Sequence, residues 1–280
     1  MLHSIVHLEY SMFFFFLGCT QEQITILDLD AGNAHVCALR NGEIHCWGGN
    51  LNGESTPPEG DFQQVRLGAY HSCAREEGGE IVCWGSDTVG QSTPPDYSFV
   101  DFDCGGNRCC GILESGSLTC WGEELQGETP EYAQRIRLGS GHACVLYEGT
   151  TACWGNDFDE VLDAPTEEAH DLASGDYHNC LLNSQNMLYC WGSNRYEQND
   201  APSGIFQRIA LGGFHSCAID VDQQLNCWGW NSVGQSSAPS GTWIQVAAGG
   251  QITCAQRTSG ELVCWGQEQI VQMVPKILQD

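Results

Sequence analysis

Apolar residues recur along the chain at fixed distances from a glycine. Three residues before that glycine stand Leu29, Val65, Phe102, Ile136, Leu172, Ile209 and Val246. Six residues before it stand Ile26, Phe62, Phe99, Ala133, Ala169, Phe206 and Trp243. Each of these segments predicts a short strand, because it shows no helical periodicity and is bounded by turn-forming residues. The chain as a whole therefore predicts an all-β protein.

The tripeptide Cys-Trp-Gly closes the unit that each of these strands opens. Its tryptophans recur at intervals of 37, 37, 33, 37, 37 and 37 residues, at Trp47, Trp84, Trp121, Trp154, Trp191, Trp228 and Trp265. A fixed period of this length is typical of a solenoid, an array or a propeller. Seven small antiparallel sheets set radially form a propeller, in which each blade buries its faces against its neighbours. We predict a seven-bladed β-propeller over residues 20–280, whose two ends meet and close the ring.

Two cysteines in every unit lie nine or ten residues apart. The pairs are Cys37 with Cys46, Cys73 with Cys83, Cys110 with Cys120, Cys144 with Cys153, Cys180 with Cys190, Cys217 with Cys227 and Cys254 with Cys264. The nine-residue spacings centre on the two-residue loops Asn41-Gly42 and Glu148-Gly149, and Asn-Gly is a strong hairpin signal. The ten-residue spacings add one loop residue, so in both cases the cysteines face each other across an antiparallel pair. We predict one disulfide-linked hairpin in each repeat.

Two further cysteines, Cys104 and Cys109, lie five residues apart in the third unit. Cys104 replaces a leucine of other units, and Cys109 precedes the paired Cys110. We predict an eighth bridge between them. The alternative is that Cys104 is a small core residue and Cys109 a reactive surface thiol.

A histidine precedes the first cysteine of five units in the pattern Gly-x-x-His-x-Cys. These histidines are His35, His71, His142, His178 and His215, and the other two units have Arg108 and Ile252 there. Metal binding by histidine and cysteine is disfavoured, because two units lack the histidine and keep both cysteines. We expect the histidines to be structural and to bond a turn within each blade.

The chain is strongly acidic, with 10 Lys and Arg residues against 36 Asp and Glu residues and a net charge of −26. Nucleic-acid binding requires a basic surface, so it is disfavoured. The sequence contains no Gly-x-Ser-x-Gly, no phosphate-binding loop and no His-Glu-x-x-His motif. We therefore expect neither an enzyme nor a cofactor, and no metal site.

Residues 1–19 lie outside the repeats, and Ser11 to Cys19 reads SMFFFFLGC. This run resembles the lipobox of bacterial lipoprotein signal peptides, in which Cys19 would carry the lipid. Seven cysteine pairs indicate an oxidising compartment, which supports export. We expect an exported protein, lipid-anchored to the bacterial envelope through Cys19 or extracellular. The alternative is a misassigned start codon.

The repeat unit, best seen from Gly212 to Gln235, resembles the regulator of chromosome condensation repeat. The family includes guanine-nucleotide exchange factors, chromatin binders and bacterial seven-bladed propellers such as the β-lactamase inhibitor proteins. The compact 37-residue unit is similar to that of the bacterial members. The resemblance implies a propeller over about residues 24 to 275.

We expect the binding residues at loop positions that vary between repeats, since the strands that support these loops are the same in every repeat. The residue before the histidine position lies in a tight connection and should line one face of the disc. We expect a monomer that binds another protein there, through Tyr70, Asn107, Arg108, Tyr177, Phe214 and Gln251. Alternatives are neutral loop variation, an exchange-type regulator, or a sugar-binding lectin. The lectin would use the asparagine or acid found three residues after each tryptophan.

Overall fold

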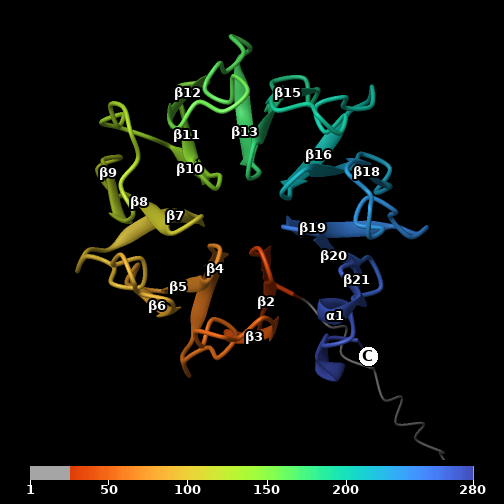
Figure 1. Cartoon of the computed structure of the whole chain (residues 1–280), viewed down its shortest axis with the longest axis horizontal. Helices are drawn as coiled ribbons and strands as arrows, with labels where there is room; N and C mark the ends of the chain where they lie inside the picture. The colour runs from red at the N-terminus through yellow and green to blue at the C-terminus, as the bar shows by residue number, and fades with distance from the viewer. Residues whose placement is uncertain (1–25, 280) are drawn as a thin grey trace, which may run out of the picture.

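Seven three-stranded antiparallel sheets stand around a central axis as the blades of a propeller (Figure 1). The structure is a computed structural model that describes residues 26–279. Each blade consists of an inner, a middle and an outer strand that follow one another in the sequence. The predicted seven-bladed all-β fold is confirmed.

The inner strands line the axis and begin each blade. They are β1 (Asp28–Ala31), β4 (Phe62–Leu67), β7 (Phe99–Gly105), β10 (Arg135–Leu138), β13 (Ala169–Ser174), β16 (Phe206–Leu211) and β19 (Trp243–Gly249). The middle strands are β2 (His35–Arg40), β5 (His71–Glu76), β8 (Arg108–Leu113), β11 (His142–Tyr147), β14 (His178–Asn183), β17 (His215–Asp220) and β20 (Ile252–Arg257). The outer strands are β3 (Glu43–Gly48), β6 (Ile81–Gly85), β9 (Leu118–Gly122), β12 (Thr150–Gly155), β15 (Leu188–Gly192), β18 (Leu225–Gly229) and β21 (Leu262–Gly266). We number the blades 1 to 7 in this order.

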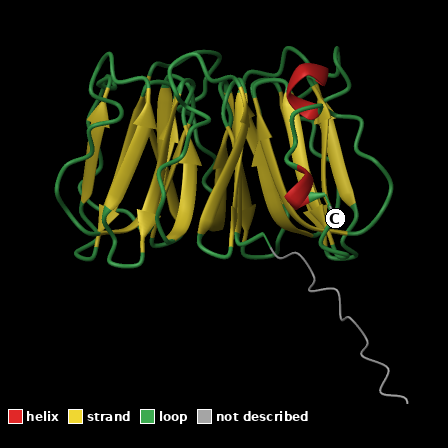
Figure 2. Ribbon diagram, turned by 90° about the horizontal axis from the view of Figure 1, so that it is seen from below, coloured by secondary structure: helices red, strands yellow, loops and turns green. Residues whose placement is uncertain are grey.

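The strands run between two faces of the ring (Figure 2). The hairpin face carries the tight turns between the middle and outer strands. The link face carries the turns between the inner and middle strands, together with the links that follow Cys-Trp-Gly. The two parts of the link face are bonded in every blade; for example, the Trp230 amide donates to the carbonyl oxygen of Phe214.

Each hairpin carries the predicted disulfide. In all seven blades the two cysteines are directly paired across the middle and outer strands, with Cα atoms 4.0 or 4.1 Å apart. Asn41 and Gly42 have φ values of 53° and 83°, which is why this turn favours the Asn-Gly sequence. The turn residues therefore fix the register that places the sulfur atoms opposite each other.

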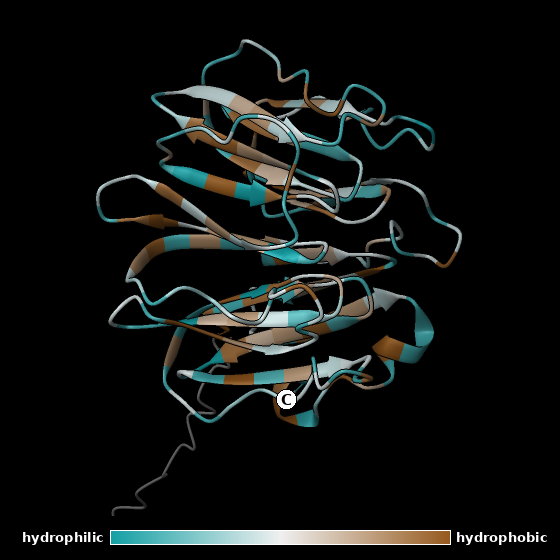
Figure 3. Cartoon of the chain, turned by 60° about the vertical axis from the view of Figure 1, so that its left-hand side comes forward, coloured by the Kyte–Doolittle hydropathy of each residue, from teal (hydrophilic) through white to brown (hydrophobic). Residues whose placement is uncertain are grey.

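The hydrophobic core lies between adjacent blades rather than inside any one of them. Between blades 1 and 2, Leu39 and Ile44 of the first hairpin pack against Phe62, Val65 and Ala74 of the next blade. The hydrophobic segments lie mainly on the strands, whereas many of the connecting loops are hydrophilic (Figure 3). An isolated blade would leave these faces exposed, so the repeats are stable only as a stacked set.

The recurrent histidines connect neighbouring blades. His178 Nε2 lies 2.8 Å from Ser216 Oγ in the next blade, and the Ser216 hydroxyl donates to the carbonyl oxygen of Gln198 at 2.8 Å. Because that hydroxyl has a single proton, Nε2 of His178 must be the donor to Ser216. The Trp228 Nε1–H also donates to the Gln198 oxygen. The histidines are structural, as expected, but each bonds a strand residue of the next blade and not a turn.

The same contact recurs at four other blade interfaces. The pairs are His35 with Ser72, His71 with Cys109, His142 with Asn179 and His215 with Thr253. The conserved spacing of the glycine before each histidine has a steric cause. A methyl group on Gly212, for example, would overlap the His215 imidazole and the carbonyl oxygen of Gly249 in the next blade.

Two blade interfaces lack the histidine, and there the facing residue of the next blade is apolar. Where Ile252 replaces the histidine, the facing residue of blade 1 is Val36, and both side chains are buried in one apolar cluster. Where Arg108 replaces it, the matching residue of blade 4 is Ala143. A histidine thus faces a residue that can form a hydrogen bond with it, whereas Ile252 and Arg108 face an apolar residue of the next blade.

The ring closes between blades 7 and 1 through the C-terminal segment. Helix α1 (Glu268–Val271) and the short 3-10 helix η1 (Lys276–Leu278) follow the last strand, and their buried residues Ile270 and Leu278 join the apolar cluster at this interface. Arg40 of blade 1 donates to the carbonyl oxygen of Ile277. The two ends meet as predicted, but these short helices were not expected.

The predicted signal at residues 1–19, including Cys19, lies outside the described residues. Among residues 26–279, no helix has both the length and the apolar character needed to cross a lipid bilayer.

Candidate functional site

The residues predicted to bind a partner lie at the link-face end of their blades, two in blade 3 and one in each of blades 2, 5, 6 and 7. Tyr70 has 49% of its side chain exposed, and Asn107 and Gln251 are half-buried. Only Tyr177 of blade 5 and Phe214 of blade 6 come together, with stacked rings whose centroids lie 4.7 Å apart. The ring of equivalent positions therefore does not form one continuous site.

Two aromatic residues from the links extend this pair into a larger cluster. Tyr196 meets the edge of Phe214 with ring centroids 5.3 Å apart, and it stacks on Trp230 at 5.6 Å. Trp230 also meets Phe214 edge to face at 6.0 Å. We call Tyr177, Tyr196, Phe214 and Trp230 the aromatic patch. Tyr196 is 45% exposed and the other three are half-buried, so the patch is rigidly packed yet accessible.

Tyr196 and Trp230 are not among the predicted residues, because they lie in the links and not beside the histidine position. Both residues follow Cys-Trp-Gly by a few positions in the links of blades 5 and 6. The signal in the sequence is the presence of an aromatic residue in each of these two links. The links bring them to the patch because each link is bonded back to the turn that carries Tyr177 or Phe214.

A hollow of about 170 Å³ adjoins the patch on the side of blade 4. It is lined by Gly141, Asn156, Phe158, Asp176 and Tyr177, among others. Gly141 occupies the position of Tyr177 in its own blade and has no side chain to fill this space. Burial raises the pKa of Asp176 to about 6. The link face thus combines an aromatic ridge with a neighbouring depression.

Arg108 does not belong to the accessible surface. It is only 4% exposed, its Nε donates to the carbonyl oxygen of Glu123, and its Nη1 donates to the carbonyl oxygen of Ser140 in the next blade. The guanidinium also pairs with the Glu123 carboxylate at 3.3 Å. The prediction that Arg108 binds a partner was therefore wrong, because the side chain joins blades 3 and 4 in place of the missing histidine.

The polar residues that supported a lectin cap their own turns. Asn50, Asp87, Asp157, Asn194 and Asn231 each accept a hydrogen bond from a backbone amide five residues further along the link. Asn231 also donates to Ser237. Their oxygen atoms are engaged in holding the links, which weakens the lectin hypothesis.

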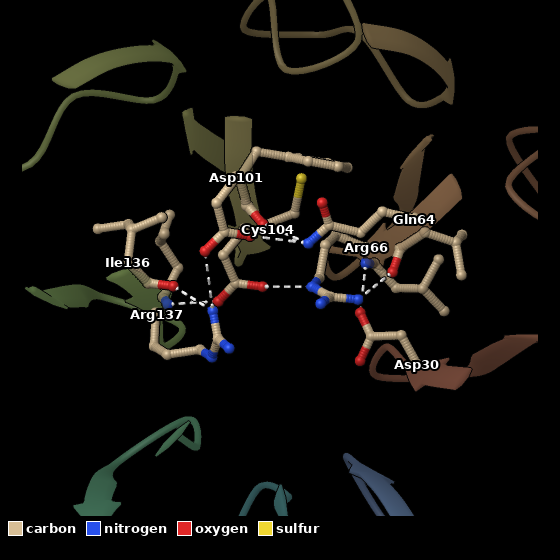
Figure 4. A network of polar contacts seen from close by, with 12 residues as sticks. Asp30, Gln64, Arg66, Asp101, Cys104, Ile136 and Arg137 are labelled. Carbon is tan, nitrogen blue, oxygen red and sulfur yellow. Dashed lines mark hydrogen bonds and ion pairs between the residues drawn. The ribbon is translucent and has the colours of Figure 1, made fainter. Parts of the chain in front are cut away.

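Charged side chains connect the inner strands around half of the central channel (Figure 4). Arg66 pairs with Asp28 of blade 1 at 2.7 Å and with Asp103 of blade 3 at 3.5 Å. Burial alone would lower the pKa of Arg66, but the surrounding carboxylates raise it overall. Arg137 of blade 4 faces Asp101 at 3.7 Å, and Gln64 donates to Asp101.

The channel carboxylates also satisfy the open edges of the inner strands. Asp30 accepts a hydrogen bond from the Leu67 amide of the next blade, and Asp103 accepts one from the Leu138 amide, both at 2.7 Å. These amides would otherwise lack a partner, since the inner strand is the edge of its sheet. Burial raises the pKa of Asp30 to about 7 despite the nearby Arg66. This network stabilises the junctions between blades.

The channel changes character at blades 5 to 7. The position of Asp30 is occupied there by Ala173, Ala210 and Ala247. The central channel, which is lined by the inner strands of all seven blades, has a volume of about 250 Å³. Charged side chains occupy the Asp30 position only in blades 1 to 4.

The repeats and the fold are similar to those of RCC1-type propellers. The sequence model of the regulator of chromosome condensation (RCC1) repeat matches residues 62–91, 169–198 and 206–235. These segments run from the inner strand to the buried glutamine of the link in blades 2, 5 and 6. Three of the seven repeats thus match the RCC1 repeat, those of blades 2, 5 and 6. No curated protein sequence matches the chain.

Several solved structures share the fold. The CRINKLY WD40 ectodomain of the Arabidopsis thaliana receptor kinase ACR4 is 23% identical, with 90% of this chain and 98% of that chain covered and a TM-score of 0.75. The ectodomain of the Physcomitrella patens receptor kinase CR4 is 22% identical, with coverages of 87% and 74% and a TM-score of 0.75. Prp20p of Saccharomyces cerevisiae is 18% identical, with coverages of 78% and 75% and a TM-score of 0.68. At these identities the likeness establishes the fold alone.

Proposed function

We propose that this protein is an exported, non-catalytic scaffold that binds another protein through the aromatic patch on its link face. The observation that carries the proposal is the cluster of four aromatic rings contributed by blades 5 and 6. Aromatic residues held rigidly on a surface are typical of the energetically dominant positions of protein interfaces. They lose little side-chain entropy on binding because they are already packed against one another.

Two further features support a protein partner. The hollow beside Tyr177 offers room for a protruding side chain next to the flat aromatic surface. In addition, the structure of Prp20p is described together with its binding to Gsp1p and histones, which are proteins. The acidic surface and its net charge of −26 oppose binding to nucleic acid.

The disulfides support export. Eight bridges are present among the described residues, and disulfides form and persist in oxidising compartments. We place the protein outside the cytoplasm, held at a membrane by a lipid on Cys19 or released.

The proposal is tested by photo-crosslinking in the producing cell. A photoreactive phenylalanine derivative replaces Tyr196 in one variant and Tyr97 in the control. Tyr97 is 53% exposed and precedes the inner strand of blade 3, at the hairpin-face end of that strand. We expect a discrete protein adduct from position 196 and none from position 97. No adduct, or the same adducts from both positions, would contradict a partner site at the patch.

A further inference from the structure

Asp176 is the one ionisable residue in the ring of seven turns that join the inner and middle strands on the link face. The equivalent residues, each directly after the recurrent glycine of its blade, are Asn33, Ala69, Gly106, Ser140, Gly213 and Gly250. Asp176 lines both the central channel and the hollow beside Tyr177. Its Oδ2 lies against blade 6, where a methyl carbon added to Gly213 would be 3.1 Å away. Asp176 therefore lies where the hollow and the channel meet.

The carboxylate of Asp176 has no hydrogen-bond or ion-pair partner among residues 26–279. Burial is the sole cause of the rise of its pKa to about 6, so no cation of the described residues lies close enough to stabilise the charged form. The carboxylate is still mostly ionised at pH 7, because that pH lies above its pKa. Asp176 thus gives the ring of turns a negative charge that has no counter-ion.

Two arginines in this part of the link face are each paired with another carboxylate. Arg108 lines the hollow, and its guanidinium pairs with Glu123 at 3.3 Å. Arg195 in the link of blade 5 pairs with Asp159 in the link of blade 4 at 3.0 Å. Neither arginine is available to Asp176, so the counter-charge has to come from solution or from a bound molecule.

Resting on the proposed function, we propose that the protein partner inserts a basic side chain, an arginine or a lysine, beside Tyr177 and pairs it with the carboxylate of Asp176. Tyr177 stacks on Phe214 towards blade 6 and lines the hollow towards blade 4. Its ring, together with the exposed Phe158 on the other side of the hollow, offers aromatic surface to the apolar stem and to the cation. The net charge of −26 attracts a basic segment before contact.

Asp176→Asn tests the pairing because it removes the charge and keeps the shape of the side chain. Asparagine is compatible with this turn, since Asn33 occupies the same position in blade 1. The matched control is Asp87→Asn, which removes a carboxylate from the link of blade 2 on the same face. Asn50 and Asn231 hold the equivalent links of blades 1 and 6 by the same hydrogen bonds, so the control should fold normally.

The first experiment needs no partner. The backbone amides of the purified full-length protein are followed by NMR during titration with capped arginine amide, capped lysine amide and capped citrulline amide, the uncharged isostere of arginine. We expect saturable shifts at Tyr177 and Gly213, which flank Asp176, with the two basic probes and not with citrulline. These shifts should be lost in Asp176→Asn and retained in Asp87→Asn. Shifts that persist in Asp176→Asn, equal shifts with citrulline, or no saturable shift with any probe would overturn the proposal.

The second experiment uses the photo-crosslinker at position 196 in the producing cell. Loss of a charge pair in the contact should reduce the yield of the protein adduct about tenfold in Asp176→Asn and leave it unchanged in Asp87→Asn. An adduct that is undiminished in Asp176→Asn overturns this inference alone and leaves the proposed function standing. If the protein without either change gives no adduct, the proposed function itself is contradicted, and the inference with it.

Discussion

His178 and Ser216 should contribute to stability as a coupled pair. The apolar pair of Ile252 and Val36 at another blade interface shows which residues can replace both of them. Ser216→Val removes the acceptor of the buried His178 Nε2–H. Leaving a buried donor without a partner costs about 1 to 3 kcal/mol. His178→Ile removes one hydrogen bond to the serine and should cost about 1 kcal/mol or more. The Gln198 carbonyl keeps its bond from Trp228 in both variants.

The double variant His178→Ile/Ser216→Val reproduces the apolar pair that Ile252 and Val36 form between blades 7 and 1. Replacing both polar partners by apolar groups can be nearly neutral, so the double variant should be about 1 to 2 kcal/mol more stable than the sum of the single changes predicts.

Urea unfolding of the oxidised proteins, followed by near- and far-UV circular dichroism, measures these differences where the two transitions coincide. Ser115→Val in an exposed hairpin is the control, and it should change the free energy of unfolding by less than about 0.5 kcal/mol. Additive effects of the two changes would refute the coupling between the blades.

Two further predictions concern pH and anchoring. Burial lowers the pKa of His35, His142 and His215 to about 4, below the unfolded value near 6.5, so protons bind more readily to the unfolded chain and stability should fall as the pH drops from about 6.5 towards 4. Asp30 has the opposite effect on stability. Because its pKa is raised in the folded protein, its contribution to the free energy of unfolding is lost as the pH rises through about 7. The urea midpoint measured across this range should decrease towards acid, and a constant midpoint would speak against buried neutral histidines. Separately, Cys19→Ser should move the protein from the membrane fraction to the soluble fraction of the producing cell, whereas an unchanged distribution would exclude the lipid anchor.

The hairpins could be predicted from sequence because their geometry is local. Asn41-Gly42 specifies a two-residue turn, and this turn sets the register that brings Cys37 opposite Cys46. The hydrogen-bond partners of the histidines could not be predicted from local sequence, because they lie in the next blade. His178 and Ser216 lie 38 residues apart, and only the stacking of blades brings them together.

The aromatic patch depends on how the links fold. Tyr196 and Trp230 lie in irregular segments, so no strand period indicates where their rings point. Their positions follow from turns held by Asn194 and Asn231 and from the backbone bond between Trp230 and Phe214. Helix α1 escaped prediction for a related reason, since four residues are too few to show a helical period.

The affinity of the crosslinked partner for a Trp230→Ala variant tests the proposed function most directly. Trp230 contacts two other rings of the patch, so its removal should raise the dissociation constant at least tenfold, which corresponds to about 1.4 kcal/mol. Leu51→Ala is the matched control, because Leu51 is 97% exposed in the link of blade 1, on the same face and away from the patch. We predict weakened binding for Trp230→Ala and unchanged binding for Leu51→Ala. Equal affinities of the two variants and the unmodified protein would contradict a partner site on blades 5 and 6.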